Sequence, residues 1–192
     1  LYSVFNFRSL SVFTGFLYFF RVVSYFYLYK LSFNIIKKDL KLKETIYNSL
    51  LLISFSVCVF GWIQYFFYPD LTSLKYLGWD DHLFRLVGTF LDPGFTSLII
   101  VFGAIHSFFK KKYILLAFFL ITLAFTYSRA GYVSLLAAIS LAGFFVKKLR
   151  VVILTIIFFG LMVFLLPRPA GQGVNLARTY SISLRMTNYK ET

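Results

Sequence analysis

The sequence predicts an all-α fold, a polytopic membrane bundle of about six transmembrane helices that forms a single domain over residues 1–192. Two features of composition indicate this fold. Of the 192 residues, 59% are hydrophobic and only 14% are charged, whereas a soluble domain usually has about 25% charged residues. The mean hydropathy is +0.78. This composition argues against a water-soluble single-core domain, and the one cysteine argues against a disulfide scaffold.

Six apolar segments are candidates for crossing a bilayer, which takes about 20 residues with a range of roughly 17–25. They are 9–29, 46–68, 93–109, 113–127, 131–146 and 151–166. Arg21 weakens the first segment, whereas the second contains no charged residue. The last four segments are short, so we expect their connections to lie close to the membrane interfaces. Internal repeats and linkers are absent from the sequence, which favours one continuous domain.

The basic residues predict an orientation for these segments. Three alternate connections, 30–43, 110–112 and 147–150, hold 11 of the 20 Lys and Arg residues. The positive-inside rule places them in the cytoplasm, so 69–92 and 167–192 are the outward loops. Topology therefore explains the net charge of +13, and we expect membrane lipids rather than nucleic acid as the partner.

The outward connections differ from the inward ones in the kind of base that they use. The inward set has ten Lys and one Arg, and the outward set has five Arg and two Lys. The planar guanidinium of arginine binds phosphate or carboxylate at two points, which lysine does not do. This bias favours an anionic ligand at the outward face. Arginines that bind lipid headgroups are the alternative.

The first outward loop ends in signals for a helix start. Asp92 is a predicted N-cap and Pro93 fits the first helical position. The exposed helix N-terminus could share an anion with Arg85, or Asp92 could only cap the helix while Arg85 pairs with Asp80 or Asp81. Asp80, Asp81 and His82 are adjacent in sequence and do not converge on one ion without a turn, so we predict no metal site.

The other outward segments carry three further candidate arginines. Arg129 lies in the short connection between the fourth and fifth segments, where it could bind a ligand or reach to phosphate headgroups. Arg178 and Arg185 are seven residues apart and share one face of a predicted short amphipathic helix. Such a helix could bring an arginine over a site between the spans. Cys58 is predicted to be a small buried hydrophobe, and His106 to lie near the inward end of its span.

These outward segments resemble those of the O-antigen ligase and O-antigen polymerase superfamily. The segments RLVGTFLDPG from Arg85, LAFTYSRAG from Leu123 and RTYSISLRMTNYK from Arg178 occur in the family's order and on one face. The similarity covers 85–189, about half of the chain. The sequence differs from the family where Asp92-Pro93-Gly94 replaces Asn-Pro-Asn and where Tyr189 replaces a common Trp.

The resemblance implies glycan transfer from an undecaprenyl-pyrophosphate-linked donor to an acceptor sugar, at the outer face of the bacterial cytoplasmic membrane. It implies that Arg85 and Arg185 are catalytic and bind the donor pyrophosphate without a metal or another cofactor, and we expect Arg178 and Arg129 to add to donor binding. The family's catalytic His would lie beyond Thr192. We therefore expect this chain, which opens at Leu1 rather than Met, to be an inactive piece of a longer enzyme.

The acceptor and the alternative function stay open at this stage. Ligase, polymerase and protein O-oligosaccharyltransferase share one mechanism and differ in the acceptor, which is lipid A-core in the first and a second lipid-linked glycan in the second. A transporter or flippase of an anionic or lipid-linked substrate is the alternative from another class. It should place ionisable residues near the middle of the membrane. The second to sixth segments hold none there, and Arg21 lies in the first.

Overall fold

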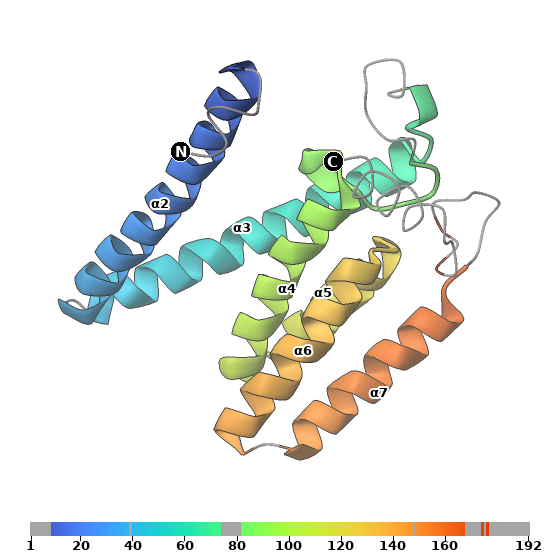
Figure 1. Cartoon of the computed structure of the whole chain (residues 1–192). Coiled ribbons are helices and arrows are strands. Elements are labelled where there is room, and N and C mark those ends of the chain that lie inside the picture. Colours follow the sequence, from blue (N-terminus) through green and yellow to red (C-terminus); the bar gives the residue numbers. More distant parts are fainter. Residues whose placement is uncertain are drawn as a thin grey trace. The chain divides into compact units, whose positions relative to one another are not determined.

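The structure, a computed structural model, describes residues 9–38, 40–73, 82–147, 149–167, 174 and 176, and these residues are all-helical apart from their connections. The helices are α2 (Ser9–Lys38), α3 (Leu40–Phe67), the short 3-10 helix η2 (Gly88–Phe90), α4 (Pro93–Phe109), α5 (Tyr113–Phe125), α6 (Arg129–Val146) and α7 (Leu149–Leu165) (Figure 1). The predicted all-α class is confirmed. The chain divides into two compact units, 1–48 and 49–192.

The first unit contains α2 and the beginning of α3. Nearly every described side chain of α2 is exposed, including a long run of aromatic residues. The sequence predicted that the helix ends near Tyr29 and that 30–43 is a connection, whereas α2 continues to Lys38 and α3 begins at Leu40. The prediction gave too much weight to charge. Segment 30–43 contains no Pro or Gly, and Lys and Leu are good helix formers, so most of this segment is helical.

The second unit is a bundle in which α4 packs against α5 and α6, and both of these pack against α7. Short connections, such as the one at 110–112, make successive helices run antiparallel (Figure 1). The bundle therefore has two different ends. We call the end where α3, α5 and α7 finish and α4 and α6 begin the arginine end, since it carries Arg85 and Arg129. The opposite end, with 110–112 and Lys147, is the lysine end.

Local capping explains the helix starts at the arginine end. The carboxylate of Asp92 accepts a hydrogen bond from the Phe95 N–H at 2.8 Å, and Pro93 is the first residue of α4, as the sequence predicted. The Ser128 hydroxyl accepts from the Gly131 N–H at 3.2 Å and caps α6. Because of this second cap, α6 begins at Arg129, two residues before the predicted start at 131.

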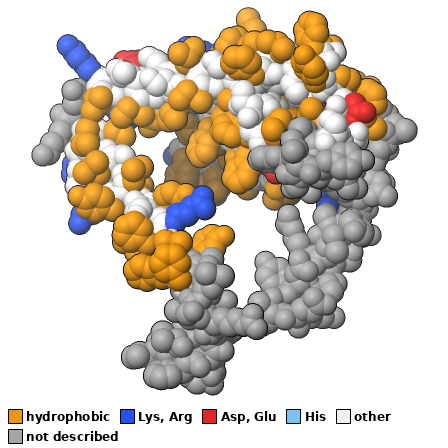
Figure 2. Space-filling model, turned by 90° about the horizontal axis from the view of Figure 1, so that it is seen from above, with side chains coloured by type: hydrophobic (Ala, Val, Ile, Leu, Met, Phe, Trp, Pro, Cys, Tyr) orange, Lys and Arg blue, Asp and Glu red, His pale blue; other side chains and the backbone are white. Residues whose placement is uncertain are grey.

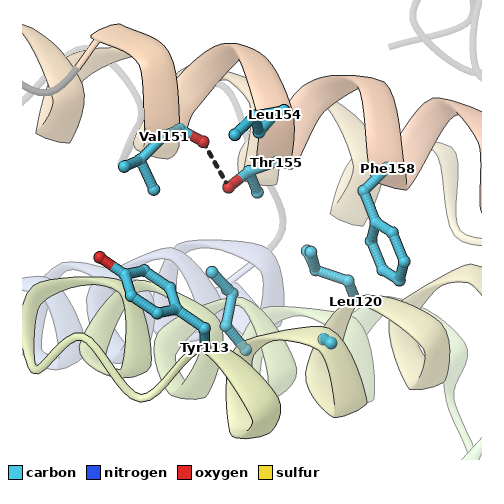
Figure 3. Close-up of a pocket in the computed structure, with 8 residues that line it drawn as sticks. Tyr113, Leu120, Val151, Leu154, Thr155 and Phe158 are labelled. Atoms are coloured by element: carbon cyan, nitrogen blue, oxygen red, sulfur yellow. Dashed lines mark hydrogen bonds between the residues drawn. The ribbon is translucent and has the colours of Figure 1, made fainter.

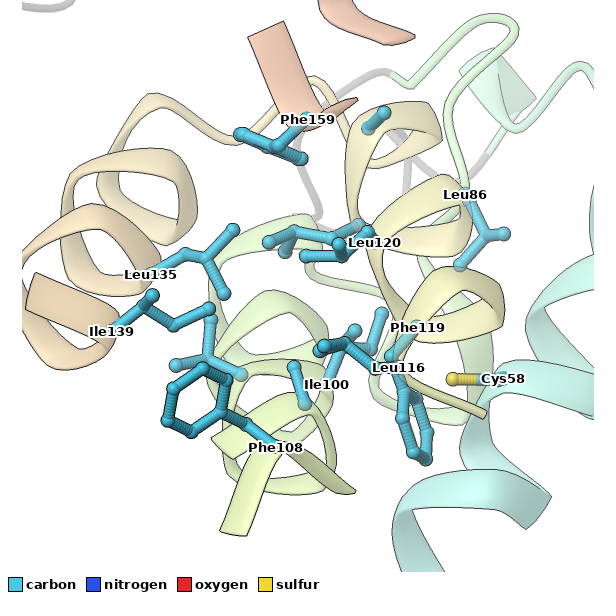
Figure 4. Close-up of a cluster of buried hydrophobic side chains, with 14 of the residues drawn as sticks. Cys58, Leu86, Ile100, Phe108, Leu116, Phe119, Leu120, Leu135, Ile139 and Phe159 are labelled. Carbon is cyan, nitrogen blue, oxygen red and sulfur yellow. The ribbon is translucent and has the colours of Figure 1, made fainter. Parts of the chain in front are cut away.

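A single hydrophobic core holds the second unit together. Figure 4 shows side chains from several elements meeting in one cluster, among them Cys58 of α3, Ile100 of α4 and Phe119 of α5, all of which are fully buried. Leu86 joins this cluster from the connection that precedes α4. Cys58 packs as a small apolar side chain, as predicted, and its thiol is not part of a disulfide. The core therefore fixes the segment that carries Arg85.

The outer surface of the described helices is largely apolar. Hydrophobic side chains cover much of the coloured surface in Figure 2, while Lys and Arg occur at scattered points. Exposed residues such as Phe102, Phe144 and Phe164 are 66–80% accessible, and apolar surface on this scale marks a lipid or protein contact. By length and composition two described helices could cross a membrane, Lys41–Phe67 and Arg129–Val146, and three shorter apolar helices, Pro93–Phe109, Tyr113–Phe125 and Leu149–Leu165, accompany them.

We predict that Gly103→Ala destabilises the bundle. A Cβ atom at Gly103 would lie 2.7 Å from Cζ of Phe119 and 2.8 Å from Cβ of Ser54, so α4, α5 and α3 would have to separate. Such overpacking typically costs about 1–3 kcal/mol. Gly160 is the matched control, because a Cβ there meets nothing within 4 Å, and alanine raises helix propensity. Unfolding of both variants in detergent measures the difference, and equal stabilities would contradict this packing.

Candidate functional site

The base of the loop 69–92, which the sequence predicts to face outward, is closed by backbone pairing. The Leu71 N–H donates to the His82 carbonyl at 2.9 Å, and the Phe84 N–H donates to the Pro69 carbonyl at 2.8 Å. This pairing returns the chain to the end of α3 after the loop. It therefore sets the start of the segment 82–92, which we call the Arg85 segment.

The carboxylate of Asp70 serves the same loop base. It accepts hydrogen bonds from the Thr72 hydroxyl at 2.6 Å and from the Thr72 N–H at 2.9 Å. Both bonds favour the charged form and lower the pKa of Asp70, and the bond from the Thr72 hydroxyl has the larger effect. A carboxylate held in its charged form by a local turn is a structural group, so Asp70 is not a candidate general acid.

Gln64 of α3 fastens the Arg85 segment to the bundle. Its side-chain oxygen accepts from the Val87 N–H at 3.0 Å, and its side-chain nitrogen donates to the Arg85 carbonyl at 3.3 Å. The same nitrogen donates to the Tyr68 carbonyl at 3.0 Å. The sequence pattern did not single out Gln64. The available signal was an amide near the end of an otherwise apolar segment.

The guanidinium of Arg85 lies against the carboxyl end of α5. Its Nε donates to the Thr126 carbonyl at 3.1 Å, its Nη2 donates to the Tyr127 carbonyl at 3.2 Å, and Nη1 lies 3.4 Å from Nδ1 of His82. Arg85 is only 4% exposed. A cation at a helix C-terminus is favourable, because the last carbonyls carry partial negative charge. Arg85 therefore caps α5 and places a fixed positive charge inside the arginine end.

The structure brings the two predicted outward motifs into direct contact. The Leu86 N–H donates to the Phe125 carbonyl at 3.0 Å, and Ser97 near the start of α4 lies 3.1 Å from the hydroxyl of Ser128. The Thr96 hydroxyl donates to the Val87 carbonyl, which ties α4 to the same segment. Residues about 30 to 40 positions apart in sequence thus form one polar cluster.

Three of the five described non-glycine residues with a left-handed backbone lie near this cluster, and the other two, Lys111 and Lys147, lie in the turns of the lysine end. Phe84, Leu91 and Tyr127 are non-glycine residues with φ values of 50–53°, a left-handed conformation that few such residues adopt. Gly88, with φ of 60°, lies between the first two. Surrounding contacts must hold such residues in place, and this kind of strain is concentrated at functional sites.

The segment after α7 folds back onto the connection between α5 and α6. The Tyr127 hydroxyl donates to the Pro167 carbonyl, and Nη1 of Arg129 donates to the Leu176 carbonyl at 3.5 Å. Val174 is buried in the hydrophobic core. Of the four candidate arginines, Arg85 and Arg129 therefore lie at the same end of the bundle, and Arg178 and Arg185 lie outside the described residues.

The structure bears on only some of the alternative roles that the sequence suggested for Asp92 and Arg85. Asp92 places its own carboxylate at the N-terminus of α4, where an anion from solution would otherwise sit. Pairing of Arg85 with Asp80 or Asp81 concerns residues outside the described part of the chain. Within the described part, three or more His, Cys, Asp or Glu side chains do not gather in any one place that could hold a metal ion.

An apolar groove lies between α5 and α7, away from the arginine end. It has a volume of about 380 Å³, and Figure 3 shows Tyr113 and Leu120 of α5 facing Val151, Thr155 and Phe158 of α7. The Thr155 hydroxyl donates to the Val151 carbonyl at 2.8 Å, so this polar group is satisfied within its own helix. The groove suits an apolar chain and carries no chemistry of its own.

Comparisons of the chain with protein families, with curated proteins and with solved structures found no match. Residue geometry and the motif resemblance are therefore the two sources of evidence about function. The geometry offers a buried cation, a half-buried arginine at a helix start and a strained polar cluster at one end of an apolar bundle. These features place two arginines and a polar cluster at one end of a bundle whose described surface is largely apolar.

Proposed function

We propose that this protein is a membrane glycosyltransferase of the O-antigen ligase or polymerase type. It would transfer a glycan from an undecaprenyl-pyrophosphate-linked donor to an acceptor sugar, at the outer face of the bacterial cytoplasmic membrane. The observation that carries the proposal is the direct contact of Arg85 with the carbonyls of Thr126 and Tyr127. Two motifs of the resemblance, far apart in sequence, meet at the end of the bundle opposite the lysine-rich connections.

The proposal includes six transmembrane segments. The exposed apolar side chains along the described helices support contact with lipid. The 13 residues of α5 extend over roughly 20 Å, which is less than the hydrocarbon core of about 30 Å. Basic side chains at both ends of α5, Lys112 and Arg129, can reach to the headgroups, and local thinning of the bilayer accommodates short helices.

The proposed reaction forms one bond and breaks another. The acceptor hydroxyl oxygen attacks the anomeric carbon of the donor glycan, and the bond from that carbon to the pyrophosphate oxygen breaks. The bonding electrons leave with the undecaprenyl pyrophosphate, and the hydroxyl proton passes to a base, for which the resemblance implies a His. The donor therefore needs stabilisation of negative charge on its leaving group, and fixed cations supply this without a metal ion.

The arginines have different places in this proposal. Arg85 provides a buried positive charge that does not have to reorganise during the reaction, because backbone carbonyls hold its guanidinium. We propose that Arg185 binds the pyrophosphate from the outward loop and that Arg129 and Arg178 add to donor binding. The acceptor is a glycan or lipid A-core. No cofactor takes part.

The placement of charge favours this enzyme over a transporter. In the described helices α4 to α7, Asp, Glu, Lys and Arg occur only at helix ends, as Arg129 and Arg150. A transporter that moves an anion across the membrane needs polar groups along its path. Chemistry on a headgroup at one surface needs them only at that surface.

We predict that the lysine end of the bundle faces the cytoplasm. The positive-inside rule requires this for 110–112 and 147–150. A cytoplasmic reporter fused after Lys111 should be active, and a periplasmic reporter should be active when it is fused after Leu91. Periplasmic activity after Lys111 would overturn the orientation and, with it, the proposed outer-face reaction. The reaction itself is tested by assaying glycan transfer from a lipid-linked donor by the full-length protein in the presence of EDTA.

A further inference from the structure

We infer that Tyr127 is a positioning residue. It fixes Pro167, the first residue of segment 167–192, against the polar cluster around Arg85. Its main-chain carbonyl accepts from Nη2 of Arg85 at 3.2 Å, and its hydroxyl donates to the Pro167 carbonyl. One side chain therefore connects the carbonyls that hold Arg85 with the first residues after α7. The predicted effect on the rate of glycan transfer rests on the proposed function. The hydrogen bond from the Tyr127 hydroxyl to Pro167, which we call the tether, does not.

The burial of Tyr127 makes this connection specific. Tyr127 is 1% exposed and is among the largest fully buried side chains described. Burial of a phenol is costly unless its hydroxyl has a partner, so the bond to Pro167 explains why tyrosine can occupy this position. Phenylalanine would fill the same space without the tether.

The backbone of Tyr127 and the residues around Pro167 support the same inference. Tyr127 has φ of 50°, a strained value that neighbouring contacts must maintain. Leu166 and Val174 are 7% and 4% exposed and belong to the hydrophobic cluster that also contains Tyr127. The chain is thus anchored at two points after α7, and the Tyr127 hydroxyl supplies the polar contact next to the first of them.

The tether bears on the proposed reaction through Arg185. Segment 167–192 carries Arg178 and Arg185, and it begins at the carbonyl that Tyr127 binds. Both arginines follow this carbonyl in the sequence, so we expect the loss of the contact to affect the part in the reaction that we propose for Arg185. Tyr127 would act on the reaction through Arg185 and has no proposed contact with the donor.

The test compares two tyrosines that lose the same chemical group. Tyr127→Phe removes the bond to Pro167, whereas Tyr132→Phe removes a similar bond, from its hydroxyl to the Ala124 carbonyl at 2.6 Å, which makes no contact with Pro167. Both are made in a full-length chain that carries Arg168→Cys, and the rate of labelling by a membrane-impermeant maleimide is measured. The chain without the added cysteine gives the background from buried Cys58.

The first readout reports on the tether alone. Loss of one net hydrogen bond should raise the labelling rate of Tyr127→Phe by about 2- to 12-fold, and Tyr132→Phe should label at the parent rate. Equal rates in Tyr127→Phe and the parent would overturn the tether, and so would an equal increase in both variants.

The second readout is a double-mutant cycle without the added cysteine. In the wild-type background, Tyr127→Phe should slow glycan transfer by roughly the factor by which it raises the labelling rate. In the Arg185→Lys background it should have little further effect. Fully additive losses would show that Tyr127 supports the fold only, which would overturn its positioning role. Absence of any transfer by the wild-type protein would instead count against the proposed function, and the labelling rates would then decide the tether.

Discussion

Replacement of Arg85 by lysine is expected to reduce glycan transfer by about 10- to 150-fold, the equivalent of one charge-assisted hydrogen bond. Lysine keeps the positive charge but cannot bind two carbonyls with a planar fork. The carbonyls of Thr126 and Tyr127 would therefore lose one of their donors. The measurement is the rate of transfer by the purified full-length protein with a lipid-linked donor.

The control for this prediction has to separate chemistry from folding. Because Arg85 is 4% exposed and caps α5, we also expect Arg85→Ala to destabilise the bundle by about 1–3 kcal/mol, since buried carbonyl acceptors are left without a donor. Transfer is therefore normalised to folded protein, measured by thermal unfolding in detergent. Normal transfer per folded molecule in Arg85→Lys would remove Arg85 from the proposed site.

Arg185→Lys is expected to reduce transfer by a similar 10- to 150-fold while the bundle remains as stable as the wild type. The reason is that Arg185 is proposed to bind the donor pyrophosphate at two points, which a lysine amine cannot do. A larger loss is expected if the contact strengthens in the transition state. The same transfer assay, together with an unfolding measurement, checks both parts of this expectation.

Arg129→Lys is the matched control for Arg185→Lys. Arg129 is half-buried and its guanidinium donates to the Leu176 carbonyl at 3.5 Å, a long and therefore weak bond. Because Arg129 is proposed to add to donor binding mainly through its charge, lysine should serve almost as well. A greater loss in Arg129→Lys than in Arg185→Lys would exchange the roles proposed for these two residues.

The sequence predicted much of the second unit because its signals are local. Helix α4 has the bounds 93–109 that the sequence predicted, since Asp92 and Pro93 mark its start and three lysines follow its end. The same approach failed between α2 and α3, where lysines suggested a connection although their helix propensity allows both helices to continue.

The candidate site could be predicted only in part, because its partners are backbone groups. Sequence spacing singled out Arg85 and Arg129, but every residue has a carbonyl, so nothing in the letters marked Thr126 and Tyr127 as the acceptors for Arg85. Gln64 and Tyr127 were missed for the same reason, since their roles depend on long-range contacts. Arg178 and Arg185 remain predictions from the sequence.

We propose that this protein transfers a glycan and releases undecaprenyl pyrophosphate at one membrane surface. The most direct measurement is the ratio of released undecaprenyl pyrophosphate to glycan joined to the acceptor, for the full-length protein in proteoliposomes with EDTA present. One lipid should be released for each glycan transferred, only when acceptor is present, and both should be lost in Arg85→Lys. Intact donor that crosses the bilayer without release of pyrophosphate would contradict this proposal and would indicate a transporter.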